Sequence, residues 1–203
     1  PGEYTLVVSK GPEYKLETRK LLIRSSQEQR VEVRLQRWID LPASGWYSGD
    51  GHIHLARPTP DENARIMAFT SAEDIHVANL LQVSNVGQKA SYLQYSFGRP
   101  GDYIEDDHSL VSGQESPRSS HRGHTIGLNA PEYVWSDDDY FVYDRIARRI
   151  TQIGGLFGYA HVAIDAFNVR YGLATDVPLG DVAFVEILQM GFMNTDYFYD
   201  FLN

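Results

Sequence analysis

The chain has 203 residues, of which 42% are hydrophobic and 22% charged, as in an ordinary globular protein, and it contains no apolar run long enough to cross a bilayer. Its formal net charge of -9 at pH 7 argues against a nucleic-acid-binding protein that neutralises phosphates. The absence of cysteine excludes disulfides, thiolate metal ligands and a cysteine nucleophile, so any metal must be held by histidine and carboxylate.

The first forty residues predict β structure. Strand-forming residues occupy 4–8 and 20–24, and charged and apolar residues alternate over 30–38, as in a half-buried strand. A turn is predicted over 25–28. We therefore expect residues 1–40 to form a few antiparallel strands, separate from the rest of the chain.

The remainder, residues 41–203, predicts an α/β domain in which strands alternate with helices. Thr59 is a predicted helix cap, with Pro60 at the first helical position and Glu62 completing a capping box. The later elements are predicted from their patterns at these positions: the first helix ending near Ala72, a strand over 75–84, long loops with short strands over 87–139, a helix over 140–153, and strands over 156–163 and 181–189.

The strongest chemical signal is the segment from Gly49 to His54. His52 and His54 point to the same side of an extended backbone, roughly 6.5 Å apart along the strand. Two imidazoles at that spacing can converge on one metal ion. Asp50 shares their face and is a candidate acceptor for an imidazole N–H. The alternative is a pair of polar residues at the end of a strand.

Four further residues are candidate ligands: Glu115, His124, His161 and Glu186. His161 ends an apolar run, where α/β enzymes place functional groups. Glu186 interrupts another, and a buried carboxylate is costly unless it is paired or bound to a metal. The alternatives are a solvated loop acid for Glu115, a core histidine for His161 and a strand-end acid for Glu186.

Other titratable residues predict structural or surface roles. His76 begins a strand and is interpreted as structural. His108 and His121 lie in polar stretches and are expected to be solvent-exposed. Asp61 is explained by helix capping. The chain has no G-x-S-x-G, P-loop, G-x-G-x-x-G or H-E-x-x-H motif, so serine hydrolase and nucleotide-binding functions lack support.

The order of these motifs resembles the PHP (polymerase and histidinol phosphatase) superfamily, and most closely its CehA/McbA-like metallohydrolase branch. The resemblance covers about residues 45–203 and is carried by these segments: 49–54, 113–115, 123–128, 160–161 and 185–186. It implies a distorted βα barrel with metals at the carboxyl ends of its strands. It also implies that His52 and His54 bind one metal, that Glu115 bridges to a second, and that His124 and His161 complete the second site.

Residues 1–40 resemble the end of a transthyretin-like or carboxypeptidase-regulatory-like β-domain. Such modules often precede this branch in exported bacterial proteins, which implies an extracellular or periplasmic location. We accordingly expect a remnant of a β-sandwich followed by the N-terminal part of a partial, distorted PHP-type barrel, from a longer product.

Three departures limit the resemblance. Ser84 and Asn85 stand where the family has an Asp-His pair, which puts a third metal in doubt. Asp61 lies one residue beyond the spacing expected for the acidic partner of that site. The family's final Asp-x-His segment is expected after Asn203. A barrel without its last strands exposes an edge, so we expect homo-oligomerisation or a compensating contact near residues 182–189.

The expected function is hydrolysis of a small-molecule substrate by a metal-activated water. One or two divalent ions (zinc, manganese or iron) are expected, with Glu186 as a further ligand and Glu115 or Asp50 orienting the water. The bond is a phosphoester, or a carboxylic or carbamic ester or amide. Two alternatives stay open: a degenerate binding module without catalysis, and a structural domain of a larger exported protein.

Overall fold

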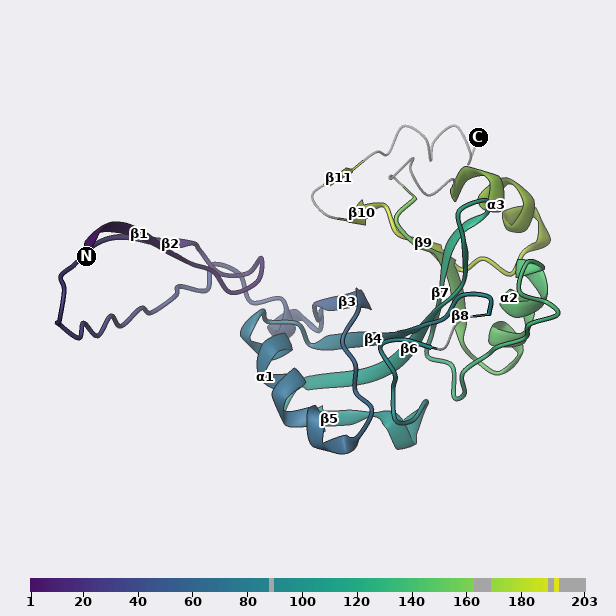
Figure 1. Cartoon of the computed structure of the whole chain (residues 1–203), viewed down its shortest axis with the longest axis horizontal. Coiled ribbons are helices and arrows are strands. Elements are labelled where there is room, and N and C mark those ends of the chain that lie inside the picture. Colours follow the sequence, from purple (N-terminus) through teal and green to yellow (C-terminus); the bar gives the residue numbers. More distant parts are fainter. Residues whose placement is uncertain (88–89, 163–168, 190–191, 194–203) are drawn as a thin grey trace.

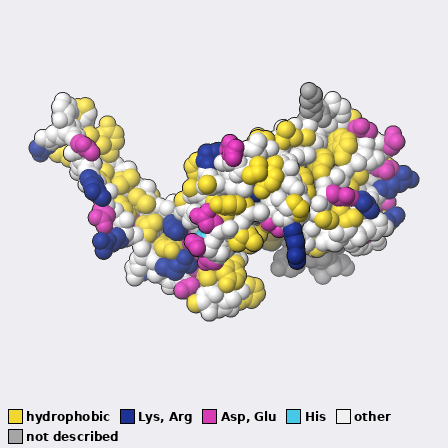
Figure 2. Space-filling model, turned by 90° about the horizontal axis from the view of Figure 1, so that it is seen from below, with side chains coloured by type: hydrophobic (Ala, Val, Ile, Leu, Met, Phe, Trp, Pro, Cys, Tyr) yellow, Lys and Arg dark blue, Asp and Glu magenta, His cyan; other side chains and the backbone are white. Residues whose placement is uncertain are grey.

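The N-terminal segment is an arm that extends away from the rest of the molecule (Figure 1). The computed structural model describes residues 1–87, 90–162, 169–189 and 192–193. β1 (Gly2–Val8) and β2 (Glu17–Ile23) pair as an antiparallel ribbon, as the sequence predicts. Apolar side chains lie exposed along the arm (Figure 2), among them Tyr4, Val7 and Leu22.

Arg37 attaches residues 1–40 to the rest of the described chain, here called the body. Its Nη1 lies 2.6 Å from Oε2 of Glu13, and its Nη2 lies 3.0 Å from Oδ1 of Asp74. Both carboxylates are buried, so the guanidinium offsets two charges that would be costly alone. The strand predicted over 30–38 is not formed. The exposure of its side chains alternates as predicted, but its only β-bridge to another residue, among the described residues, joins Arg37 to Tyr14.

The body is built on one curled, mixed sheet. Its order is β3-β4-β6-β7-β8-β9, with β5 paired to β6. The bounds of its strands are β3 (Gly49–Ile53), β4 (Val77–Val83), β5 (Tyr103–Glu105), β6 (His108–Ser119), β7 (Gly123–Leu128), β8 (Leu156–Tyr159) and β9 (Phe184–Val185). A second, two-stranded sheet consists of β10 (Leu188–Gln189) and β11 (Phe192–Met193).

The predicted parallel arrangement holds for part of this sheet only. β3, β4 and β6 are mutually parallel, and so are β8 and β9, but β7 is antiparallel to both of its neighbours. Residues 120–122 alone connect β6 to β7, and so short a connection permits only antiparallel pairing. The result is a mixed α/β fold with a half-barrel sheet and few helices (Figure 1).

β6 explains the curl. Its first part pairs with β4 and its last part with β7, and its register against β7 shifts between Glu115 and Arg118. Such an irregularity bends a strand and increases its twist. The loops and short strands predicted over 87–139 are confirmed in part: residues 90–102 and 129–139 contain no strand and β5 is short, but the Gly- and Ser-rich sequence from His108 to Ser119 forms a central strand of 12 residues.

Three of the described helices pack against the sheet. α1 (Asn63–Ala72) packs Ile66 and Met67 on Leu80 and Leu110. α2 (Tyr143–Gln152) packs Ile146 and Ile150 on β8 through Phe157 and Tyr159, with α3 (Val169–Asp176) beside it. Leu81, Ile126 and Ala160 form a third buried cluster. No described helix has the length and apolar character needed to cross a membrane.

The predicted end of α1 at Ala72 is confirmed, but its predicted capping box is not formed. Thr59 has the extended backbone of a cap, yet its side chain makes no capping hydrogen bond, and Glu62 pairs with Arg65 instead. A 3-10 turn (Pro60–Glu62) precedes the helix. Self-association at residues 182–189 stays a prediction: β9 ends the order of the curled sheet, and Ile187 beside it is exposed.

Arg57 is expected to be the side chain whose loss destabilises the body most. It is fully buried, and it donates to Gln94, Asn63, Gly101 and Ser112 over 2.7–3.2 Å. Arg57→Ala leaves these acceptors buried without a donor, so the free energy of unfolding should fall by about 3 kcal/mol.

Urea unfolding followed by circular dichroism measures this change. Arg65→Ala is the matched control, because Arg65 is exposed and its loss should change stability by less than about 0.5 kcal/mol. Equal effects of the two substitutions would contradict a structural role for the Arg57 contacts.

Candidate metal centre

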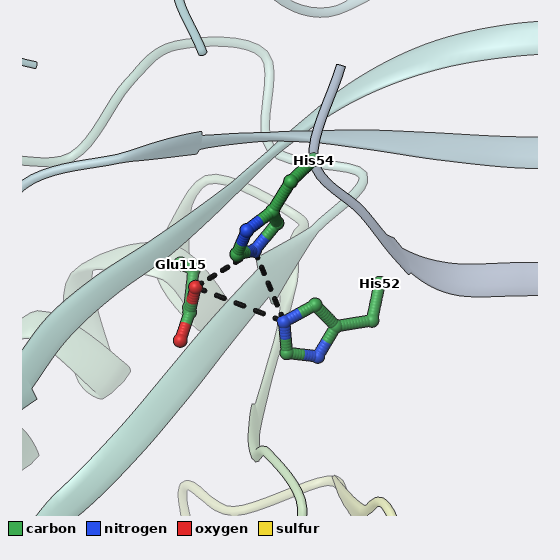
Figure 3. A group of neighbouring side chains, drawn as sticks. All are labelled: His52, His54 and Glu115. Carbon is green, nitrogen blue, oxygen red and sulfur yellow. Dashed lines mark hydrogen bonds and ion pairs between the residues drawn. The ribbon is translucent and has the colours of Figure 1, made fainter. Parts of the chain in front are cut away.

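His52 and His54 converge with Glu115 at the carboxyl end of β3 (Figure 3). The Nε2 atoms of the two histidines lie 3.1 Å apart, and Oε2 of Glu115 lies 2.9 Å from Nε2 of His54 and 3.7 Å from Nε2 of His52. A tetrahedral zinc ion with bonds of about 2.0–2.1 Å separates its ligands by about 3.3 Å. The three distances bracket that value, so these atoms can hold one ion as the first subsite.

The other oxygen of Glu115 faces a second pair of histidines. Oε1 lies 2.7 Å from Nδ1 of His124 and 3.9 Å from Nε2 of His161, and those two nitrogens lie 3.1 Å apart. These three residues form the second subsite. Because each carboxylate oxygen of Glu115 serves one histidine pair, the group has the geometry of a centre bridged by Glu115, here called the Glu115 centre.

The position of Glu115 in β6 brings the two pairs together. It is aligned with Val83 of β4 and Ile126 of β7 and is 1% exposed. Gly113 permits this close packing, because a Cβ there would lie 2.7 Å from a methyl of Leu81. The interpretation of Glu115 as a solvated loop acid is therefore wrong.

His161 follows β8 in a left-handed backbone conformation, with φ of 35°. That conformation costs on the order of 1–3 kcal/mol for a residue with a side chain and persists where the surrounding structure fixes it. Its backbone N–H donates to Oε2 of Glu186 over 3.0 Å. The strained turn, its contact with Glu186 and the ring beside Glu115 distinguish His161 from an ordinary core histidine.

Glu186, predicted as a metal ligand, lies behind His52. Its Oε2 is 2.9 Å from Nδ1 of His52, the ring nitrogen that faces away from Glu115. A histidine that binds metal usually donates its other N–H to such an acceptor. The geometry thus gives Glu186 the positioning role that the sequence assigned to Asp50, whose Oδ1 accepts the backbone N–H of His52 over 2.8 Å.

The electrostatics of the centre match a cation site. Burial lowers the pKa of His52, but contacts with Glu115 and Glu186 outweigh it and raise this pKa to about 9. Burial raises the pKa of Glu115, but the four surrounding imidazoles outweigh it and hold this pKa far below its usual range. Burial lowers the pKa of His124 despite the nearby carboxylate. Glu115 is therefore ionised, and His52 holds a proton that a metal would replace.

Two residues near the centre were not predicted as part of a metal site. Nε of Arg118 lies 3.5 Å from Oε1 of Glu115, and the Tyr92 ring lies 4.9 Å from the ring of His54. Residues three apart on a regular strand face opposite sides, and the register shift after Glu115 returns Arg118 to the same side. A bulge of this kind leaves no clear pattern in the sequence.

The remaining candidates lie away from the Glu115 centre. Ser84 is buried, and its carbonyl oxygen accepts from the Tyr140 hydroxyl over 3.4 Å. Asp61 and His121 are exposed, the latter as predicted. His76 is buried, which agrees with its predicted structural role. His108 was predicted to be exposed, but it begins β6 and stacks on His76 with ring centroids 4.7 Å apart.

Comparison of the chain with protein-family models, with curated proteins and with solved structures found no match. The candidate site therefore depends on its geometry and on the sequence motifs alone.

Metal affinity is expected to rise with pH. The raised pKa of His52 means that its contacts stabilise the metal-free protein fully below about pH 6.5 and that this stabilisation is lost as pH rises through about 9. Metal displaces that proton, so affinity should increase by up to about tenfold per pH unit between pH 6.5 and 9. Titration calorimetry with Mn²⁺ at several pH values measures the slope, and an affinity independent of pH would contradict the assignment.

Loss of the carboxylate behind His52 should weaken metal binding without unfolding the protein. Glu186→Gln keeps the shape of the side chain but removes its charge, and we expect a loss of about 10–100-fold in affinity. Glu132→Gln, at an exposed ion pair with Arg149, is the matched control. Equal affinities of the two variants in the same titration would show that Glu186 does not support the ligand.

Proposed function

We propose that the chain is the metal-binding part of a metal-dependent hydrolase of the PHP superfamily, in its CehA/McbA-like branch. The observation that carries the proposal is the buried carboxylate of Glu115, whose two oxygens each face a separate histidine pair. Carboxylate-bridged sites of this kind hold two ions about 3.5–4 Å apart in hydrolytic enzymes. The first subsite alone suffices for a single ion.

The donor set supports zinc, manganese or iron. Imidazole and carboxylate ligands suit these ions, and the chain has no thiolate that would favour copper(I) or an iron–sulfur cluster. Oε2 of Glu115 is buried and, among the described residues, makes no hydrogen bond, although Nε2 of His54 lies only 2.9 Å away. An acceptor without a well-aligned donor is what a metal-binding oxygen requires.

The ligands of the Glu115 centre would hold a divalent ion, which would supply Lewis acidity toward the scissile group and a water that is nucleophilic near neutral pH. The residues of the chain prepare the position. Glu186 fixes the ring of His52, and Glu115 holds the two subsites together. Arg118 places a positive charge beside them, where it can stabilise an oxygen that becomes negative. Asp50 is proposed to orient the attacking water.

Space for a small-molecule substrate lies next to His52. A cavity of about 700 Å³ lies beside β3 and is lined by residues 48–52, by Pro12, Glu73 and Ile75, and by Leu128, Phe184, Glu186 and Ile187, so that it meets the Glu115 centre at His52. This size is typical of small-molecule sites. The bond that fits the proposal is a phosphoester, or a carboxylic or carbamic ester or amide. We propose that the reaction takes place in the periplasm or the extracellular space, and the resemblance to exported proteins supports this location.

The test is turnover by the protein loaded with Zn²⁺, Mn²⁺ or Fe²⁺ on panels of phosphoesters, carboxylic esters, carbamates and amides. Glu115→Gln and His54→Ala should each lower kcat/KM for the best substrate by at least about a thousandfold, because they disrupt both subsites and the first subsite respectively. His121→Gln is the control, since His121 is exposed in the turn between β6 and β7. Turnover that is unchanged by Glu115→Gln would contradict the proposal.

Two other outcomes point to the alternatives. Metal binding without turnover on any panel favours a binding module. A thermal melt tests whether the chain is only a structural domain. A metal at a hundred times its Kd should stabilise the native state by about 2.7 kcal/mol, so a chelator should lower the melting temperature of a metal-binding protein. If a chelator lowers the melting temperature of the His52→Ala/His54→Ala double variant by as much as that of the unsubstituted protein, the histidines of the first subsite do not bind the metal and only pack the mouth of the sheet.

A further inference from the structure

A second group of metal-ligand side chains lies at the opposite end of the sheet. One carboxylate oxygen of Asp74 and one ring nitrogen each of His76 and His108 lie within 4.8 Å of one another. His76 immediately precedes β4, and His108 begins β6. From residue 108 to Glu115 the extended strand covers roughly 23 Å, so this group is independent of the Glu115 centre.

The hydrogen bonds of Ser48 determine which nitrogen of His76 carries a proton. The Ser48 hydroxyl donates its only hydrogen to the backbone oxygen of Asp74. Nδ1 of His76, which lies 2.8 Å from the same hydroxyl oxygen, must therefore be the donor in that contact. In the neutral ring this leaves a lone pair on Nε2, and Nε2 faces Oδ2 of Asp107 at 3.5 Å. A cation held between this nitrogen and the carboxylate would satisfy both.

His108 adds to this excess of acceptors. Its Nδ1 lies 2.7 Å from Oδ1 of Asp107, while its Nε2 is buried and makes no hydrogen bond among the described residues. The rings of His76 and His108 stack at 4.7 Å with an angle of 14°. A divalent ion would pair one lone pair of each ring with the carboxylate of Asp74, whose ligand atoms already lie close together.

Asp74 can contribute although it already has a partner. Nη2 of Arg37 lies 3.0 and 3.1 Å from its two oxygens. A carboxylate has about four acceptor positions, so this contact does not exhaust them. It also orients the carboxylate, as outer hydrogen bonds commonly do for metal ligands. Asp107 is different, because its side chain is 56% exposed and offers an entry path for an ion.

We propose that Asp74, His76 and His108 bind a structural zinc ion, here called the basal site, and that the exposed Asp107 beside the two histidines supplies the fourth ligand. Two imidazoles and two carboxylates supply the four ligands and the nitrogen and oxygen chemistry that zinc prefers. The ion joins the end of α1, through Asp74, to the starts of β4 and β6. Because Asp74 also holds Arg37, the basal site fixes the attachment of the N-terminal segment to the body.

The test counts zinc bound per chain by mass spectrometry of the metal after dialysis against Zn²⁺, with the full chain. His108→Gln should lower the count by one relative to the unsubstituted protein. The His54→Ala/His124→Ala double variant, which removes a ligand from each subsite of the Glu115 centre, should still retain one zinc. Zn²⁺ should still raise the melting temperature of that double variant, and adding His108→Gln should abolish the rise.

Two further variants keep the test decisive. Asp107→Ala removes an exposed ligand that contributes little to packing, so it should lower the count by one even if a buried-histidine variant fails to fold. His121→Gln should leave the count unchanged. The proposal is overturned if the count is unaffected by both His108→Gln and Asp107→Ala, or if the double variant retains no zinc. Neither the zinc count nor the melting temperature depends on turnover, so failure of the basal site can be distinguished from failure of the hydrolase proposal.

Discussion

The buried carboxylate of Glu115 is the constraint on which the described structure depends. A charge 1% exposed in the middle of a sheet is too costly to keep without partners, and the fold supplies four imidazoles from three different strands or their ends. The register of β6 against β4 and β7, the strained turn at His161 and the curl of the sheet all bring those partners within reach. The site and the fold are thus parts of one electrostatic arrangement.

The same arrangement has a layered order. Glu115 lies at the centre, the histidines surround it, and Glu186 supports His52 from outside while also accepting the backbone N–H of His161. One carboxylate therefore links both subsites through a side chain and a backbone group. A change at Glu186 is felt at both histidines, although Glu186 itself faces away from the space that the metal would fill.

The sequence predicts much of this from local patterns. The pair His52 and His54 follows from the two-residue period of a strand, and β1, β2, β4 and α1 follow from propensity and periodicity. The burial of Glu115 and the position of Arg118 do not, because both depend on long-range pairing of a Gly- and Ser-rich strand and on its register shift. Likewise, the antiparallel β7 and the buried, stacked His108 depend on tertiary contacts that no short window of sequence contains.

The length and register of β6 also decide where the chain can be altered. Adding one residue anywhere between His108 and Glu115 would reverse the facing of every side chain after it, turning Glu115 away from the histidines. The turn at residues 120–122 does not set this register, but Arg122 within it pairs with the buried carboxylate of Asp176 over 2.6 Å, which leaves His121 as its exposed position. A fluorophore therefore belongs on the side chain at position 121, where it can report on the sheet without displacing either Arg122 or the carboxylate at the centre.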